Sequence, residues 1–276
     1  MPELPEVETV ANSVNAHVRG QQIVSVWLSR YKEPFKTSRT EMAEALTATR
    51  IEKVYREGKH IVFDLHGPGG AARKSAQWIV HLGMTGRLLV SAPEVPVPKH
   101  MHAVLALSGG RELRFVDARR FGRLALHRSE GGAGFRGPGR EPLTISPEDF
   151  VALFRGRKLS IKAALLNQTL LHGVGNIYAD ESLFRAGIRP TRAAGKLSRE
   201  RLLRLHAALK EILQKAIKLG GSSVSDYVDA DGVAGFFQLE HNVYLRTGEP
   251  CRVCGRPIRR LVLAGRGTHY CAHCQK

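Results

Sequence analysis

The sequence predicts an α+β protein: a β-sandwich with an N-terminal helix, followed by a helical domain and a zinc hairpin held by four cysteines. Three observations support this class. Short β-rich runs fill the first half of the chain, helical apolar periodicity fills the second half, and the cysteines lie in two Cys-x2-Cys pairs near the end. A Gly- and Pro-rich stretch at residues 129–142 divides the halves, which places a domain boundary there.

The first half begins with a helix at residues 4–19. Its valines and Ala11 recur every three or four residues, Pro5 is tolerated in the first turn, and Gly20 is a natural stop. Several short runs rich in β-branched and aromatic residues follow, which favours a β-sandwich. The clearest runs lie at residues 23–27, 61–65 and 78–80, with a hairpin at Gly109-Gly110 and a short helix near residues 39–47.

The second half is predicted to be helical. Ser146 and Ser198 stand where a side-chain oxygen caps a helix N-terminus, and Gly220-Gly221 closes the long amphipathic helix that follows Ser198. Further helices are expected at residues 161–170 and 177–185, a loop of small and polar residues at 222–240, and the zinc module from about residue 242. The expected domains are residues 1–135, 143–235 and 242–276.

The composition indicates a nucleic-acid partner. The 276-residue chain carries a formal net charge of +17, yet 43% of its residues are hydrophobic, so the charge belongs to a folded surface. A polyanion suits such a surface, and nucleic acid is favoured over an anionic membrane. No apolar run approaches the roughly 20 residues of a spanning helix. The acidic N-terminus is unlike a signal peptide, and thiols of metal-binding type predict a cytoplasmic protein.

The cysteines predict a structural zinc ion. Cys251, Cys254, Cys271 and Cys274 form a Cys-x2-Cys pair, a 16-residue spacer and a second pair. Four thiolates at this spacing make a closed tetrahedral site that leaves no position for catalysis. The hairpin between them is rich in arginine, which is typical of nucleic-acid binding.

Two further segments could carry chemistry. Removal of Met1 before Pro2 would leave a secondary amine beside Glu3, and such an amine is a good nucleophile toward a carbon that can become an imine. The turn LHGVGN, residues 171–176, could direct backbone N–H groups at a phosphate from the start of the next helix. Taken alone, the turn favours a helix–helix corner capped by Asn176, whereas the net charge of +17 and the zinc hairpin favour the phosphate site.

Four motifs together resemble the bacterial formamidopyrimidine-DNA glycosylases of the formamidopyrimidine/endonuclease VIII family. These are MPELPEVETV at the start, HLGMTG from His81, RRFG from Arg119 and GVGNIYADESLF from Gly173, followed by the four-cysteine hairpin. The resemblance covers the chain from end to end. Leu4 and the Gly220-Gly221 loop favour the formamidopyrimidine branch over the endonuclease VIII branch.

The resemblance implies a bifunctional DNA glycosylase and abasic-site lyase of base excision repair. Such an enzyme excises oxidised purines, 8-oxoguanine and formamidopyrimidines, from double-stranded DNA and then cuts the strand by β,δ-elimination. It further implies a helix–two-turn–helix in the second domain, one structural zinc ion, a monomer, and a place on the bacterial nucleoid. Pro2 would attack C1′ of the flipped nucleotide and Glu3 would donate a proton to the opening sugar.

The remaining site residues are assigned through the same resemblance. Lys59 and Arg266 match the family residues that contact phosphates and serve the elimination steps. Met84, Arg119 and Phe121 match the trio that fills the gap left by the flipped base. Phosphate contacts are expected from His100, Asn176, Arg157 and Lys162. Of the other acidic residues, Glu8 is explained by the preference of carboxylates for a helix N-terminus, and Glu6 is expected to be structural.

Three departures from the family pattern affect these expectations. Ala118 and Ala163 stand where proline is common, Ser222-Ser223 replaces Thr-Thr, and residues 66–77 resemble an insertion. Serine keeps the hydroxyl, so contacts with the damaged base survive while the lesion preference is less certain. Two alternatives stay open: an oxidised-pyrimidine glycosylase of the sister branch, and a non-catalytic DNA-binding protein with a zinc hairpin.

Overall fold

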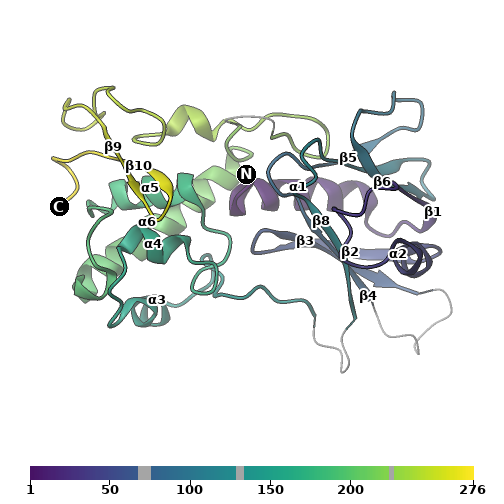
Figure 1. The fold of residues 1–276 in the computed structure, drawn as a ribbon, viewed down its shortest axis with the longest axis horizontal. Coiled ribbons are helices and arrows are strands. Elements are labelled where there is room, and N and C mark those ends of the chain that lie inside the picture. Colours follow the sequence, from purple (N-terminus) through teal and green to yellow (C-terminus); the bar gives the residue numbers. More distant parts are fainter. Residues whose placement is uncertain (68–75, 129–133, 224–226) are drawn as a thin grey trace. The chain divides into compact units, whose positions relative to one another are not determined.

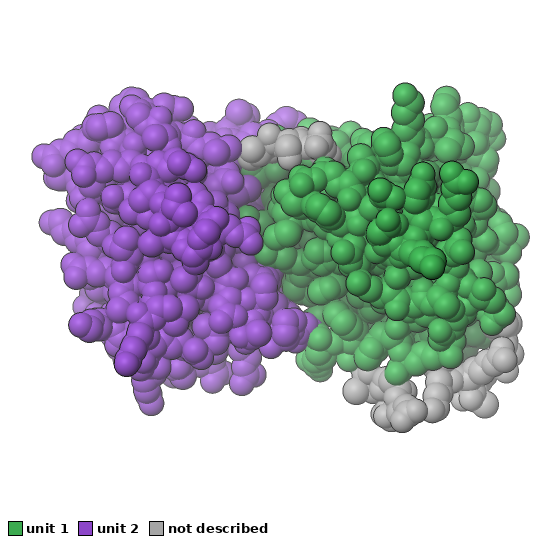
Figure 2. Space-filling model, viewed as in Figure 1, with its two compact units in different colours: residues 1–136, 220–235 green, residues 137–219, 236–276 purple. Residues whose placement is uncertain are grey.

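The computed structural model describes residues 1–67, 76–128, 134–223 and 227–276 (Figure 1). They form two compact units, residues 1–136 with 220–235 and residues 137–219 with 236–276 (Figure 2). The helical domain was expected to extend to residue 235, whereas residues 220–235 pack with the first unit. Parts of the expected insertion, of the 129–142 break and of the 222–240 loop lie outside the described residues.

The first unit is a β-sandwich, as predicted. Two four-stranded antiparallel sheets have the strand orders β1-β6-β7-β5 and β2-β3-β4-β8. No individual run was predicted for β2, β5 or β8, each of which begins with an arginine and has few fully buried residues. The strands are β1 Ile23–Leu28, β2 Arg50–Glu57, β3 His60–His66, β4 Ala76–His81, β5 Arg87–Ser91, β6 Met101–Leu107, β7 Glu112–Val116 and β8 Arg123–Arg128.

Helix α1 (Leu4–Val18) packs against this core, and it begins directly after Pro2 and Glu3, the predicted catalytic residues. Its apolar stripe, including Val7, Val10 and Val14, is buried in one cluster with side chains of both sheets, such as Phe63 and Phe115. The helix packs on β2, β3 and β5, and α2 (Arg39–Leu46) packs on β1. The first turn of α1 is therefore held rigidly by the sandwich core.

The second unit is mainly helical, and Ser146 and Ser198 cap their helices as predicted. Each serine hydroxyl accepts a hydrogen bond from the backbone N–H three residues on, at 3.1 Å in α3 and 3.3 Å in α6. Helix α6 ends before Gly220. This glycine has a φ of +74°, a left-handed conformation that terminates the helix. The elements are α3 Pro147–Phe154, α4 Ile161–Leu166, α5 Asn176–Arg185, η1 Ala194–Lys196, α6 Arg199–Lys218, η2 Phe237–Glu240, β9 Arg259–Leu263 and β10 Arg266–Tyr270.

Helix α4 ends at Leu166 rather than near residue 170, because polar side chains there form a double turn. Asn167 Oδ1 accepts from the Thr169 N–H at 3.0 Å. Gln168 donates to Val174 O at 2.8 Å and accepts from the Gly173 N–H at 3.0 Å. These side chains replace helical hydrogen bonds and fix the expected helix–two-turn–helix. Within the described residues, no helix has both the length and the apolar character needed to cross a membrane.

Candidate functional site

The N-terminus of α1 is a buried acidic corner. Pro2, Glu3 and Glu6 are all buried, with Glu3 4% and Glu6 2% exposed. The Glu3 N–H donates to Glu6 Oε2 at 2.8 Å, so the side chain of Glu6 folds back over the first turn. Pro5 in that turn and carboxylates near the positive end of the helix dipole make this a stable helix start. The structure therefore brings the predicted Pro2 and Glu3 together at a fixed point.

Glu6 also binds the loop after α6. Its Oε1 accepts from the Ser222 N–H at 2.7 Å, and its carbonyl accepts from the Tyr227 hydroxyl at 3.2 Å. Burial, and secondarily the charge of Glu6, raises the pKa of Tyr227 well above its usual value, so the phenol stays protonated and can donate. A Cβ on Gly221 would lie 2.9 Å from Glu6 Oε1, so only glycine permits this approach.

Ser223 closes the same loop on itself. Its hydroxyl donates to Tyr227 O at 2.9 Å and accepts from the Gly235 N–H at 2.8 Å. The serine that stands in place of the usual threonine thus uses its hydroxyl to join the two ends of the loop.

Lys59 lies in the two-residue turn between β2 and β3, after Gly58, whose φ is +61°. The half-buried side chain of His81 on β4 is near it. Burial, then the charges of His60, Lys59 and Arg123, lower the pKa of His81 from 6.5 to about 4. His81 is consequently neutral near pH 7, and its Nδ1 accepts from the Gly83 N–H at 3.0 Å. This hydrogen bond fixes the loop that carries Met84.

The gap-filling candidates lie on two adjacent loops. Met84 is 41% and Phe121 47% exposed, so both apolar side chains are accessible at the surface. The Arg119 guanidinium lies over the Phe121 ring at 4.8 Å. A Cβ on Gly83 would be 2.5 Å from the Gly122 nitrogen, so the two loops touch through their backbones. His100 is exposed just before β6, with a φ of +64°, and its DNA contact stays a prediction.

In the second unit, the expectation that Lys162 contacts a phosphate is corrected. Its side chain is fully buried, 2.6 Å from Asp180 Oδ1, and donates to Gly267 O at 3.0 Å. A buried ammonium needs such a partner, because desolvation would otherwise cost several kcal/mol. Asp180 also accepts from the His269 N–H at 2.8 Å. Lys162 is therefore part of the support between α4, α5 and β10.

Asn176 contacts strand β10, and Arg266 is the first residue of that strand. Asn176, the first residue of α5, donates to Gly267 O at 2.9 Å, and Gly175 rather than Asn176 is the N-cap. Arg266 follows the tight turn Ala264-Gly265, both at positive φ, and its side chain is exposed. Arg157 is half-buried and donates to Leu153 O. For these three residues a role in DNA binding stays a prediction.

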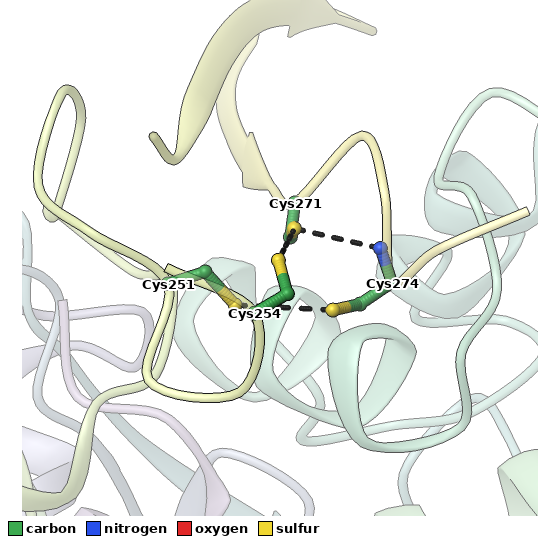
Figure 3. Close-up of side chains that lie close together, drawn as sticks. All are labelled: Cys251, Cys254, Cys271 and Cys274. Carbon is green, nitrogen blue, oxygen red and sulfur yellow. Dashed lines mark hydrogen bonds between the residues drawn. The ribbon is translucent and has the colours of Figure 1, made fainter. Parts of the chain in front are cut away.

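The four cysteines converge as a metal site requires (Figure 3). Their sulfur atoms all lie within 4.8 Å of one another, with pairs at 3.5 Å and 3.9 Å. Tetrahedral zinc with Zn–S bonds of about 2.3 Å separates sulfurs by about 3.8 Å, so the set fits one ion. Backbone N–H groups of Val253 and Cys274 each donate to a cysteine sulfur at 3.5 Å, which favours thiolates.

Without a cation, the surroundings of the sulfur atoms favour the neutral thiol. Burial, followed by hydrogen bonds with the other three cysteines, raises the pKa of the Cys274 thiol. A divalent cation at the centre reverses this effect because it stabilises all four thiolates. The cysteines also belong to a small apolar cluster with Phe184, Val243 and Ile258, which is too small to hold the hairpin by itself.

Comparison with known families decides the assignment. Residues 1–124 match the formamidopyrimidine-DNA glycosylase N-terminal domain, residues 138–228 its H2TH domain, and residues 248–276 the zinc finger found in FPG and IleRS. The chain belongs to the formamidopyrimidine-DNA glycosylase family. The resemblance inferred from the motifs is thereby confirmed, as is the expected zinc finger.

Relatives of this family match over the whole chain. The formamidopyrimidine-DNA glycosylase of Solibacter usitatus is 45% identical over 276 residues, and that of Desulfitobacterium hafniense 43% identical over 286; both comparisons cover each chain completely. A Lactococcus lactis FPG mutant in complex with Fapy-dG-containing DNA has a TM-score of 0.88 at 36% identity, with complete coverage of both chains. The MutM (FPG) protein of Thermus thermophilus has a TM-score of 0.84 at 40% identity, covering 99% of this chain and 98% of that one.

Some features of this region escaped sequence reasoning. Glu6 and Ser222 were singled out separately, but they are too far apart in sequence for a local pattern to predict their contact. Asp180 lies at a buried position of a helix, which is rare for a carboxylate without a partner, but its partner could not be identified from spacing. Asp117 lies two residues before the RRFG motif, and its burial gave no local signal.

Proposed function

We propose that this chain is a bifunctional DNA glycosylase and abasic-site lyase of base excision repair, acting on 8-oxoguanine and formamidopyrimidines in double-stranded DNA. The full-length similarity to the glycosylase family carries the proposal. Two structures in that family hold DNA with Fapy-dG or an abasic site. The net charge of +17 suits the same partner.

The proposed nucleophile is the secondary amine of Pro2. In the 276-residue chain this nitrogen is an amide, so removal of Met1 is required. The amine attacks C1′ of a nucleotide flipped out of the duplex, and the C1′–N bond to the damaged base breaks. Ring opening of the sugar then gives an iminium ion between Pro2 and C1′. The positive nitrogen acidifies the C2′–H, so β-elimination of the 3′ phosphate becomes possible.

Glu3 is proposed to donate the proton that the opening sugar takes up. Its burial at the start of α1 supports this role, because it holds the carboxyl group next to the proposed nucleophile, Pro2. Lys59 and Arg266 are proposed to grip phosphates and assist β- and δ-elimination. Met84, Arg119 and Phe121 would occupy the space of the flipped base, and His100, Arg157 and Asn176 would contact the DNA backbone.

Zinc has no chemical step in this mechanism. The four cysteines hold the ion, which stabilises the β9–β10 hairpin and so fixes the position of Arg266. We further propose that the protein acts as a monomer in the bacterial cytoplasm, at the nucleoid.

Borohydride trapping tests the proposal directly. The processed protein is incubated with duplexes containing 8-oxoguanine or thymine glycol, with sodium borohydride present to reduce the iminium. A covalent adduct that forms faster with 8-oxoguanine is expected, and an N-terminally extended protein should bind DNA without forming it. Faster trapping on thymine glycol would favour the pyrimidine-specific branch. DNA binding without any adduct would favour a non-catalytic protein.

A further inference from the structure

A single buried carboxylate joins the two loops that carry the gap-filling side chains. Asp117 is 0% exposed and lies at the base of the loop 117–122, which bears Arg119 and Phe121. Its Oδ1 accepts from the Thr85 hydroxyl at 2.6 Å and from the Arg119 N–H at 3.2 Å, and its Oδ2 accepts from the Gly122 N–H at 2.7 Å. Thr85 directly follows Met84 on the other loop.

Asp117 is itself held by the sandwich. Its N–H donates to His100 O at 3.0 Å, and its carbonyl is 3.0 Å from His102 Nε2. The other ring nitrogen of the buried His102 lies 3.1 Å from the Ser29 hydroxyl. Contacts with strands β6 and β7 and with Ser29, the residue after β1, therefore hold Asp117 in place before any DNA is bound.

The two loops also touch without side chains. Gly83 has a φ of +64°, and a Cβ there would lie 2.5 Å from both Gly122 N and Phe121 C. The tight turn ends where the Gly86 N–H donates to Leu82 O at 2.9 Å. Thr85 thus supplies the side-chain hydrogen bond, and Gly83 the backbone contact, between two loops that are separate in sequence.

We propose that Thr85 and Asp117 are positioning residues that hold the Met84 loop and the Arg119–Phe121 loop together as one preformed wedge. This inference rests on the proposed function of the three exposed side chains. Ordering a side chain during binding costs conformational entropy and so weakens the binding free energy. If the two loops are already held together, insertion into DNA does not carry this cost. Thr85 and Asp117 touch neither the lesion nor the nucleophile in this scheme.

Thr85→Val is the informative change. Valine keeps the shape of threonine and removes the hydroxyl. Asp117 then loses one hydrogen bond and the Arg119 N–H loses its contact with Thr85 Oγ1 at 3.4 Å, while the backbone contact at Gly83 stays. Thr85→Ser restores the hydroxyl and is the conservative rescue. Thr49→Val is the matched control, because Thr49 is a buried threonine of the same unit whose hydroxyl donates to Leu46 O at 2.6 Å. Arg119→Ala reports on the wedge itself.

The experiment is single-turnover base excision on two substrates, 8-oxoguanine paired with cytosine and 8-oxoguanine opposite an abasic gap. A gap removes most of the work of separating the base pair. Thr85→Val should slow excision of the paired lesion by about tenfold, the size expected for a lost hydrogen bond to a buried charge, and of the gapped lesion by less than about threefold. Thr85→Ser and Thr49→Val should show no such difference between substrates.

Equal slowing of Thr85→Val on both substrates, or none on either, would overturn the inference. The gapped substrate also serves as the folding control, since a misfolded variant fails on it as well; Thr85→Ser must then recover the paired rate if the hydroxyl is responsible. The outcomes separate the two levels of the proposal. Native protein that excises neither lesion removes the proposed function and the inference with it. The inference alone fails if the native protein excises 8-oxoguanine and Arg119→Ala slows mainly the paired substrate, but Thr85→Val does not distinguish the two substrates.

Discussion

The carboxylate of Glu6 joins the first helix to the backbone of Ser222: its Oε1 accepts from the Ser222 N–H at 2.7 Å, across 216 positions of sequence. Its other oxygen accepts from the Glu3 N–H at 2.8 Å. Both oxygens of one buried side chain thus face backbone donors, one beside the proposed nucleophile and one in the loop after α6. Glu6 therefore links the Ser222 backbone to the start of α1.

Glu6→Gln should uncouple the two segments. An amide has one acceptor oxygen, so its NH2 group must face either the Ser222 or the Glu3 N–H, and one hydrogen bond is replaced by two opposed donors. We expect a loss of about 1–3 kcal/mol of stability and faster hydrogen exchange at the Ser222 amide, measured by mass spectrometry. Glu44→Gln, an exposed carboxylate of α2, is the control and should change neither quantity. Unchanged exchange at Ser222 would show that the loop is held by other contacts.

Lys162 and Asp180 should be far more important for folding than for DNA affinity. Lys162→Met leaves Asp180 buried without its counter-ion, and breaking such a pair costs about 3–5 kcal/mol. Urea unfolding measures this loss. Arg199→Met removes an exposed ion pair with Glu148 at 3.3 Å and should cost less than about 1 kcal/mol. Adding Asp180→Asn to Lys162→Met should recover part of the stability, whereas additive losses would mean that the two side chains do not interact energetically.

Lys162 illustrates what sequence could and could not predict. The fold class, the first helix, the capped helices and the four thiolates follow from local patterns, because periodicity, caps and Cys-x2-Cys spacing act within a few residues. A lysine at the start of an alanine-rich helix looks like a surface cation until the tertiary structure buries it against Asp180. Ser222, Tyr227 and Glu6 likewise meet only because glycines at 220 and 221 let the chain return to the first unit.

Removal of zinc should unfold the hairpin locally. Cys254→Ser leaves three thiolates and an incomplete tetrahedron, and the apolar cluster around Phe184 and Ile258 cannot hold the hairpin without the ion. We expect hydrogen exchange to accelerate over residues 245–276 and DNA binding to weaken sharply, while the β-sandwich melts at nearly its original temperature. Val253→Ser, an exposed change between the same cysteines, is the control. Calorimetry that showed simultaneous loss of both units would contradict local unfolding.

Stability should fall as the pH drops from about 6.5 to about 4, in part because of His81. Its pKa is lowered from 6.5 to about 4 in the folded protein, mainly by burial, so in this range the unfolded chain binds a proton that the folded chain does not. The free energy of unfolding therefore rises with pH across this window and is constant above it, with a contribution of at most about 3 kcal/mol. His241, whose pKa is also lowered to about 4, adds a second contribution in the other unit.

His81→Asn separates the two contributions. Asparagine Oδ1 can still accept from the Gly83 N–H, as Nδ1 of His81 does at 3.0 Å, but asparagine does not titrate. Urea unfolding of the variant between pH 7 and pH 4 should therefore show a smaller loss of stability than the native protein, with the slope due to His241 remaining. Thr49→Val, which changes a buried residue of the same unit without altering any titratable group, is the control and should leave the pH dependence unaltered. A native-like slope in His81→Asn would mean that the pKa of His81 is the same in the folded and the unfolded protein, so that its burial does not contribute to the pH dependence.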